Sequence, residues 1–160
     1  MIFITTGTQE PFDRLIKVAD EIAALLPEVP FKVQAFTAVY QAQHIEVVNF
    51  MTPVEFEDNL RKASLIISHA GMGTIISALV NQKPIIVMPR LLKFKEHRNE
   101  HQLATARKLD ELKYIAVAYD EKELKLKVME MWPDKLNCMH QVGKFASARL
   151  IDSLKGFINE

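Results

Sequence analysis

Short apolar runs alternate with amphipathic segments along the chain. Continuous or alternating apolar residues at positions 2–6, 31–35, 45–50, 65–67, 85–88 and 114–118 predict β-strands. Between these runs, apolar residues recur every three or four positions, as at Leu15, Val18, Ile22 and Leu26, which is typical of one helix face. Such spacing predicts helices near 13–26, 53–62, 73–79, 99–109, 121–131 and 141–157. The alternation indicates a parallel sheet with helices on both faces, a doubly wound α/β fold.

Two of the predicted helices begin with capping residues. The Thr52 hydroxyl can cap the helix near 53–62, Pro53 suits its first position, and Glu55 completes a capping box. Asp120 and Glu123 stand in the same relation at the helix near 121–131. The starts of these two helices are therefore the best-marked element boundaries in the sequence.

The stretch at 64–79 is a strand, a tight turn and a helix start, with the sequence S-H-A-G-M-G-T at 68–74. Gly71 and Gly73 have no Cβ, so the backbone can turn sharply and a ligand can approach closely. The first-turn N–H groups and the helix dipole favour an anion there, usually phosphate. The pattern is neither a P-loop nor the dinucleotide fingerprint, whose third glycine would fall at Ile76. Phosphate binding and a purely structural turn are equally compatible with these residues.

The carboxyl ends of parallel strands meet at one edge of a sheet, so the segments 7–9, 50–51, 69–74 and 90–102 should gather there. Residues 90–98 are polar, basic and aperiodic, and we expect them to form a mobile loop. The densest polar cluster is E-H-R-N-E-H-Q at 96–102, which fits hydrogen bonding to a sugar or ribose, or a solvated loop. His97 and His101 have the spacing of metal ligands, but no third ligand is evident.

Several individual side chains are compatible with more than one role. His69 can contact a phosphate, act as a base or cap the glycine turn. Cys138 is better explained as a buried thiol than as a nucleophile, and Trp132 as a packing residue than as a sugar platform. No Ser-His-Asp triad and no pair of glycosidase carboxylates stands out from the spacing.

Composition narrows the class of protein. The 160 residues suit one domain spanning 1–160, and 49% hydrophobic residues supply a sizeable core. The 20 basic and 20 acidic residues cancel, which argues against nucleic acid as a partner. The only cysteine, Cys138, excludes an intramolecular disulfide and fits a reducing cytoplasm. We expect no signal peptide and no transmembrane segment, and membrane contact only through a partner.

The motifs together resemble the C-terminal domain of glycosyltransferase family 28. They are the segment at 68–74, K-P-I-I-V-M-P at 83–89 and the cluster at 96–102, with T-G-T at 6–8 and F-D-R-L-I at 12–16. The likeness covers roughly residues 1–109 and is strongest with stand-alone donor-binding subunits of two-part transferases. These are of the dolichol-linked N-acetylglucosaminyltransferase type or the bacterial capsule and exopolysaccharide type.

The resemblance implies the C-terminal half of a GT-B fold that binds a UDP-sugar as donor substrate, with no cofactor and no metal. Residues 7–9 would face the diphosphate, Met51 would place its backbone against the uracil, residues 71–74 would hold the phosphates, and Gln102 and its neighbours would meet the donor sugar or ribose. The implied donor-binding residues are Gly7, Thr8, Gln9, Met51, His69, Gly71, Met72, Gly73, Thr74, Ser77, Glu96, Asn99, His101 and Gln102. No catalytic residue is implied within the chain.

Two positions depart from the family pattern. Much of the family has a Glu where this chain has Ser77, and that Glu bonds the ribose hydroxyls. Serine makes a shorter and weaker contact, so either Glu96 substitutes for it or donor affinity or preference differs. Thr105 stands where some relatives have Asn.

A single GT-B half implies that the acceptor and the catalytic base lie on a second, membrane-associated polypeptide. We expect an obligate hetero-oligomer on the cytoplasmic membrane face, with exposed apolar surface at its interface. The expected function is transfer of a hexose or N-acetylhexosamine to a lipid-linked glycan in polysaccharide or glycoconjugate biosynthesis. One alternative is a non-catalytic accessory or enhancer subunit, which Ser77 keeps open. Another is a different nucleotide-binding enzyme, such as half of a sugar-nucleotide epimerase, against which the absent second domain argues.

Overall fold

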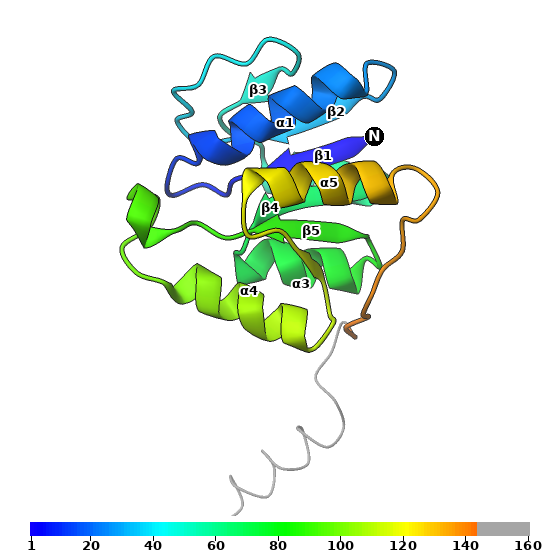
Figure 1. The fold of residues 1–160 in the computed structure, drawn as a ribbon. Helices are drawn as coiled ribbons and strands as arrows, with labels where there is room; N and C mark the ends of the chain where they lie inside the picture. Colours follow the sequence, from blue (N-terminus) through cyan, green and yellow to red (C-terminus); the bar gives the residue numbers. More distant parts are fainter. Residues whose placement is uncertain (144–160) are drawn as a thin grey trace, which may run out of the picture.

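Six parallel strands form one sheet in the order β3-β2-β1-β4-β5-β6 (Figure 1). The computed structural model describes residues 1–143. The strands are β1 (Ile2–Thr5), β2 (Phe31–Gln34), β3 (Val47–Val48), β4 (Leu65–His69), β5 (Ile85–Met88) and β6 (Ala116–Val117). The helices are α1 (Asp13–Leu25), α2 (Pro53–Lys62), α3 (Met72–Val80), α4 (His101–Glu111) and α5 (Glu121–Met131), with the 3-10 turn η1 (Leu92–Phe94).

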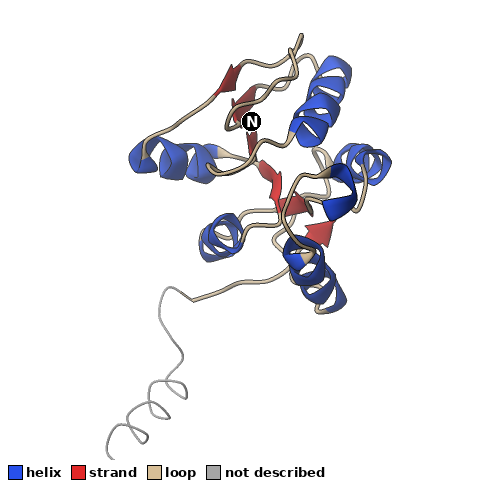
Figure 2. Ribbon diagram, turned by 90° about the vertical axis from the view of Figure 1, so that its left-hand side faces the viewer, coloured by secondary structure: helices blue, strands red, loops and turns tan. Residues whose placement is uncertain are grey.

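Alternate residues of each strand enter two separate apolar layers. Ile2 and Ile4 of β1 pack with the buried residues of α1 and α5, whereas Phe3 packs with those of α2, α3 and α4. The same alternation occurs in β4 and β5, so both faces of the central strands are buried. Figure 2 shows helices on the two sides of the sheet. The doubly wound α/β fold expected from the sequence is confirmed.

The predicted strands are all present, and the two outermost ones are shorter than expected. The run at 45–50 contributes only Val47–Val48, and the run at 114–118 only Ala116–Val117, because edge strands pair on one side alone. The helix predicted at 141–157 lies outside the described residues except for 141–143, which are not helical. The loop predicted at 90–98 contains η1, which has no apolar periodicity.

The predicted helix caps are present, with one difference in detail. Thr52 accepts a hydrogen bond from the Glu55 N–H, and the Glu55 carboxylate accepts one from the Thr52 N–H, which completes the expected box. Asp120 likewise accepts from the Glu123 N–H at 2.8 Å. The Glu123 carboxylate, however, accepts from the N–H of Tyr119, one residue before the cap. The second box is therefore only half formed as predicted.

The sheet order reverses between β1 and β4. From β1 the chain builds outward to β2 and β3, and from β4 it builds in the opposite direction to β5 and β6. The loops that follow β1 and β4 therefore run in opposite directions from the carboxyl ends of these strands. In open α/β sheets this divergence opens a crevice that binds ligands. The topology places residues 6–12 and 70–71 on the two sides of this crevice.

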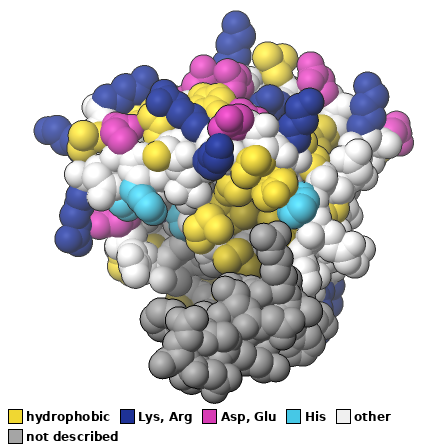
Figure 3. Space-filling model, turned by 90° about the horizontal axis from the view of Figure 1, so that it is seen from below, with side chains coloured by type: hydrophobic (Ala, Val, Ile, Leu, Met, Phe, Trp, Pro, Cys, Tyr) yellow, Lys and Arg dark blue, Asp and Glu magenta, His cyan; other side chains and the backbone are white. Residues whose placement is uncertain are grey.

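No helix within residues 1–143 is long and apolar enough to cross a bilayer. Apolar side chains do reach the surface, and on the underside of the view in Figure 1 they gather next to charged ones (Figure 3). Near the carboxyl edge of the sheet, Phe50, Val54, Met72 and Ile76 are all exposed. The described part of the chain thus carries apolar surface that its own core does not use.

Candidate functional site

The glycine turn between β4 and α3 contributes the first part of the site. Gly71 is the N-cap of α3, and no side chain of the part of the chain that the structure describes caps the helix at this end. The N–H groups of the first turn, at Met72, Gly73 and Thr74, have no intrahelical acceptor in such a geometry. They carry the positive end of the helix dipole toward the crevice. This end of α3 is therefore suited to an anion.

The three glycines at the site differ in what surrounds the position of a Cβ atom. Gly7 adopts φ +77°, a backbone conformation that side chains with a Cβ rarely take. A Cβ on Gly71 would lie 2.2 Å from His69 Nε2, so the imidazole fills the space where that side chain would be. A Cβ on Gly73 would meet no atom of residues 1–143 within 4 Å. Gly7 and Gly71 are thus required by the protein itself, whereas the space at Gly73 is open.

His69 lies between the two glycine turns, because its ring approaches the Cβ positions of both Gly7 and Gly71. Burial, assisted by the positive charge of Arg90, lowers the pKa of His69 to about 4. The imidazole is therefore neutral at pH 7. Its Nδ1 is buried and has no hydrogen-bond partner among residues 1–143. His69 can offer the site a hydrogen bond but not a positive charge.

Arg90 supplies the charge that His69 lacks. It follows β5 and is only 3% exposed. Its guanidinium donates to the carbonyl of Thr6 at 2.7 Å and to the carbonyls of Glu10 and Pro11, and it lies over the Phe12 ring. Burial lowers the pKa of Arg90 to about 10, so it stays protonated at neutral pH. Arg90 therefore holds the loop after β1 and adds a positive charge beside it.

Two adjoining pockets open at this crevice. The first, the polar pocket, has a volume of about 280 Å³ and is lined by Thr6, Gly7, Thr8, Gln9, Glu10, His69, Gly71, Gly73, Thr74, Arg90, His97 and Gln102. The second, the apolar pocket, has about 520 Å³ and is lined by Thr5, Gly7, Thr8, Gln34, Phe50, Met51, Pro53, Phe56, Glu57, Gly73 and Thr74. The two share four residues, so a ligand with a polar and an apolar part can occupy both.

Most of the residues expected at the donor site line these pockets. Gly7, Thr8, Gln9, His69, Gly71, Gly73, Thr74 and Gln102 line the polar pocket. Met51 lines the apolar pocket. The side chain of Gln102 accepts a hydrogen bond from the Arg90 N–H at 3.2 Å, which ties α4 to the loop after β5. Met72, Ser77, Glu96, Asn99 and His101 line neither pocket.

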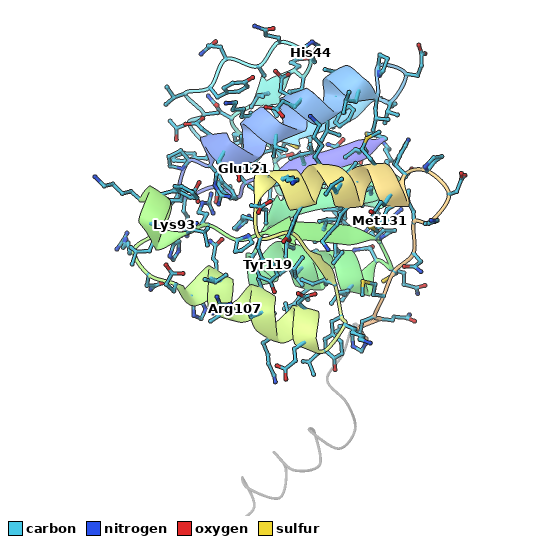
Figure 4. The ribbon with its side chains drawn as sticks, viewed as in Figure 1. His44, Lys93, Arg107, Tyr119, Glu121 and Met131 are labelled. Atoms are coloured by element: carbon cyan, nitrogen blue, oxygen red, sulfur yellow. The ribbon has the colours of Figure 1, made fainter. Side chains whose placement is uncertain are left out.

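Glu96, which the sequence places at the donor site, binds other residues of the protein. Its carboxylate accepts two hydrogen bonds from Arg14, each at 2.8 Å, and a third from the Leu91 N–H at 3.0 Å. Arg14 also pairs with Glu121 at 3.2 Å. Figure 4 shows Glu121 at the start of α5, facing the η1 loop that carries Lys93. Glu96 therefore anchors the loop after β5 and lines neither pocket, and its expected contact with the donor stays a prediction.

Sequence reasoning missed Arg90 as a buried residue of the site. It assigned positions 90–98 to a mobile loop because the segment is polar, basic and aperiodic. The signal that would have identified Arg90 is its place directly after Pro89, where the buried strand β5 ends at the carboxyl edge of the sheet.

Within residues 1–143, no three His, Cys, Asp or Glu side chains gather as a metal site requires. His97 instead contacts Asn99.

The family model of the glycosyltransferase family 28 C-terminal domain matches residues 1–152. The chain belongs to this family. Its relatives include the UDP-N-acetylglucosamine transferase subunit ALG13 of Yarrowia lipolytica, 29% identical over 133 residues, which are 75% of this chain and 65% of that protein. The ALG13 of Cryptococcus neoformans is 29% identical over 115 residues, 71% of this chain and 56% of the relative. The chain thus spans a little over half to about two thirds of these relatives.

Solved structures of glycosyltransferases share the fold. The NMR structure of ALG13 aligns with a TM-score of 0.59 at 21% identity, over 96% of this chain and 93% of that one. Spinosyn forosaminyltransferase SpnP aligns with a TM-score of 0.56 at 17% identity, over 99% of this chain and 43% of the enzyme. The glycosyltransferase of kitacinnamycin aligns with a TM-score of 0.59 at 20% identity, over 83% and 35%. The sheet therefore has the architecture of one half of a GT-B enzyme.

Proposed function

We propose that this chain is the donor-binding subunit of a UDP-sugar-dependent glycosyltransferase. The enzyme would transfer a hexose or N-acetylhexosamine to a lipid-linked glycan in polysaccharide or glycoconjugate biosynthesis. The observation that carries the proposal is the pair of joined pockets at the point where the sheet order reverses. A nucleoside diphosphate sugar has the matching division into an anionic part and a flat, largely apolar base.

The polar pocket suits a diphosphate. The first turn of α3 and the buried guanidinium of Arg90 both place positive charge at its wall, and His69 offers a neutral ring. The apolar pocket suits a pyrimidine, because Phe50, Met51 and Phe56 line it. The donor sugar would then extend along the polar pocket toward Gln102.

The chemistry follows from these charges. An acceptor hydroxyl attacks the anomeric carbon of the donor sugar as the bond from that carbon to the diphosphate oxygen breaks. Negative charge develops on the departing UDP, and the helix N-terminus and Arg90 stabilise it electrostatically. The proton of the hydroxyl passes to a base that we assign to the partner subunit. No covalent intermediate with this chain is needed.

The relatives named as UDP-N-acetylglucosamine transferase subunits support a two-part enzyme. We propose that the partner is membrane-associated, binds the acceptor and recruits this chain to the cytoplasmic face of the membrane. The exposed apolar residues near the carboxyl edge of the sheet, including Phe50 and Val54, give such a partner a surface to cover.

A second candidate is an accessory subunit that activates a catalytic partner and binds nucleotide weakly. Ser77 favours it, because the side chain lies outside both pockets and brings no carboxylate to the donor. The two candidates differ in whether the subunit must hold the donor. Loss of donor binding by mutation would abolish transfer in the first case and leave it intact in the second.

The first experiment is calorimetric titration of the full chain with UDP, UDP-glucose, UDP-galactose and UDP-N-acetylglucosamine, for the wild type and Gly73→Asp. Saturable binding by the wild type, lost in the variant, is the expected result, because a carboxylate in the open space at Gly73 repels the diphosphate. Binding that survives Gly73→Asp would place the nucleotide elsewhere. Absence of binding to every ligand would overturn the donor role of this chain.

A further inference from the structure

The apolar pocket contains one charged side chain that the proposed function has not used. Glu57, on α2, is the only charged residue among those that line this pocket, all of which belong to the described part of the chain. Its side chain is 36% exposed. A carboxylate at the wall of an otherwise apolar pocket is a hydrogen-bond acceptor with no donor of its own.

The carboxylate is held in place through one of its two oxygens. Oε1 accepts from the Nδ2 group of Asn81 and from Nε of Arg61, each at 3.2 Å. Within residues 1–143, Oε2 has no hydrogen-bond donor from the protein. Glu57 is therefore anchored and has one oxygen left for a ligand.

Glu57 also lies beside the part of α3 that contains Ser77. The Nδ2 group of Asn81 donates to the backbone carbonyl of Ser77 at 2.9 Å and to Glu57 at 3.2 Å. One amide group thus joins the Glu57 carboxylate to the second turn of α3. Glu96, the carboxylate that the sequence suggested instead, is bound to Arg14.

We propose that Glu57 recognises the 2′,3′-diol of the nucleotide ribose. The proposal rests on the function argued above and names one residue that sets its specificity. Oε2 accepts hydrogen bonds from the ribose hydroxyls while the base occupies the apolar pocket and the diphosphate the polar one. A vicinal diol offers the two adjacent donors that a carboxylate binds well.

The two pockets carry mixed charges. Arg90 and the N-terminus of α3 bring positive charge to the polar pocket, which Glu10 also lines. Glu57 brings negative charge to the apolar pocket and pairs with Arg61 at 3.2 Å. A neutral diol can donate hydrogen bonds to Oε2 of Glu57, whereas an ionised phosphate has no donor to offer it. The ligand class we propose is therefore a ribonucleotide rather than a deoxyribonucleotide.

The test compares binding of UDP, 2′-deoxy-UDP and 3′-deoxy-UDP to the full chain, for the wild type, Glu57→Ala and the control Asp58→Ala. Asp58 is an exposed acid on the same helix and lines neither pocket. The wild type should bind UDP about tenfold more tightly than either deoxy analogue, since one hydrogen bond to a charged group is lost. Glu57→Ala should weaken UDP binding by a similar factor and abolish the discrimination. Asp58→Ala should behave as the wild type.

The outcomes distinguish the role of Glu57 from the existence of the donor site. A wild type that binds all three ligands equally would overturn the role of Glu57 and leave the donor site intact. A Glu57→Ala variant whose affinity falls equally for UDP and for the deoxy analogues would also overturn the role of Glu57, because a change in folding or pocket shape affects the binding of every ligand. A wild type that binds no UDP would overturn the donor site itself.

Discussion

Two alanine substitutions in the glycine turn should have opposite effects on stability, and only the second is expected to block a phosphate. Gly71→Ala places a methyl group 2.2 Å from Nε2 of His69, well inside van der Waals contact. The same Cε1–Nε2 edge of the imidazole lies close to the Gly7 turn, whose Cβ position is 2.8 Å from Cε1. Gly73→Ala places its methyl group in open space, with no atom of the described residues within 4 Å. The two changes are chemically identical and two residues apart.

The expected magnitudes follow from these contacts. Overpacking of this kind costs about 1–3 kcal/mol, and the lower entropy of the unfolded alanine variant returns about 0.4–1 kcal/mol. Gly71→Ala should therefore lower the free energy of unfolding by about 1–2 kcal/mol, which for a domain of this size is about 3–6 °C in Tm. Gly73→Ala should raise it by about 0.5 kcal/mol, because alanine is the better helix former. It should weaken UDP binding at least about tenfold, since its methyl group occupies the space a phosphate needs.

The assay is urea unfolding of both variants followed by calorimetric titration with UDP. A Gly71→Ala protein as stable as the wild type would mean that His69 is free to move and does not explain the glycine. A Gly73→Ala protein with wild-type UDP affinity would refute the phosphate site at α3, because the ligand would not approach the backbone there. A Gly73→Ala protein that is both less stable and weaker in binding would refute the claim that this space is open.

Three further predictions concern the charged residues around the pockets. Arg90→Met should lower the free energy of unfolding by about 2–4 kcal/mol in urea titrations, because three loop carbonyls lose their donor, and a loss below about 0.5 kcal/mol would contradict this. Glu96→Gln should lower it by about 2 kcal/mol and leave UDP affinity unchanged, whereas unchanged stability with lost affinity would restore a direct role at the donor. Because His69 has a folded pKa of about 4 and an unfolded value near 6.5, the unfolded chain binds the extra proton between these values. Stability should therefore rise by up to about 3 kcal/mol from pH 4 to 6.5, and His69→Asn should flatten that slope.

Local signals in the sequence predicted the fold well. The strands and helices alternate with clear apolar periods. Thr52 and Asp120 mark helix starts through hydrogen bonds with residues only three positions further along the chain. The glycine turn likewise depends on neighbours in sequence, because His69 explains Gly71 two positions later. Edge strands were overestimated, since apolar content alone does not reveal how far a strand finds a partner.

Charged residues of the site were harder to assign, because their partners are distant in sequence. The carbonyls that Arg90 binds lie 79 to 84 positions away, and Glu96 meets Arg14 at a separation of 82. A basic loop residue that is exposed and one that is buried against such carbonyls have the same local pattern. Only the crossover that brings β1 and β5 to either side of β4 distinguishes them.

Glu57 and Glu96 illustrate the consequence for function. Both are acids near the carboxyl edge of the sheet, and position in the motif favours Glu96 as the substitute for the missing carboxylate at Ser77. The contacts within residues 1–143 favour Glu57 instead, because Arg14 and the Leu91 N–H donate to Glu96, whereas Glu57 lines the apolar pocket and its Oε2 has no donor among these residues. A carboxylate is the better ligand site when it lines the pocket and the protein donates few hydrogen bonds to it. Which acid meets that condition is decided by packing between helices that the motif does not contain.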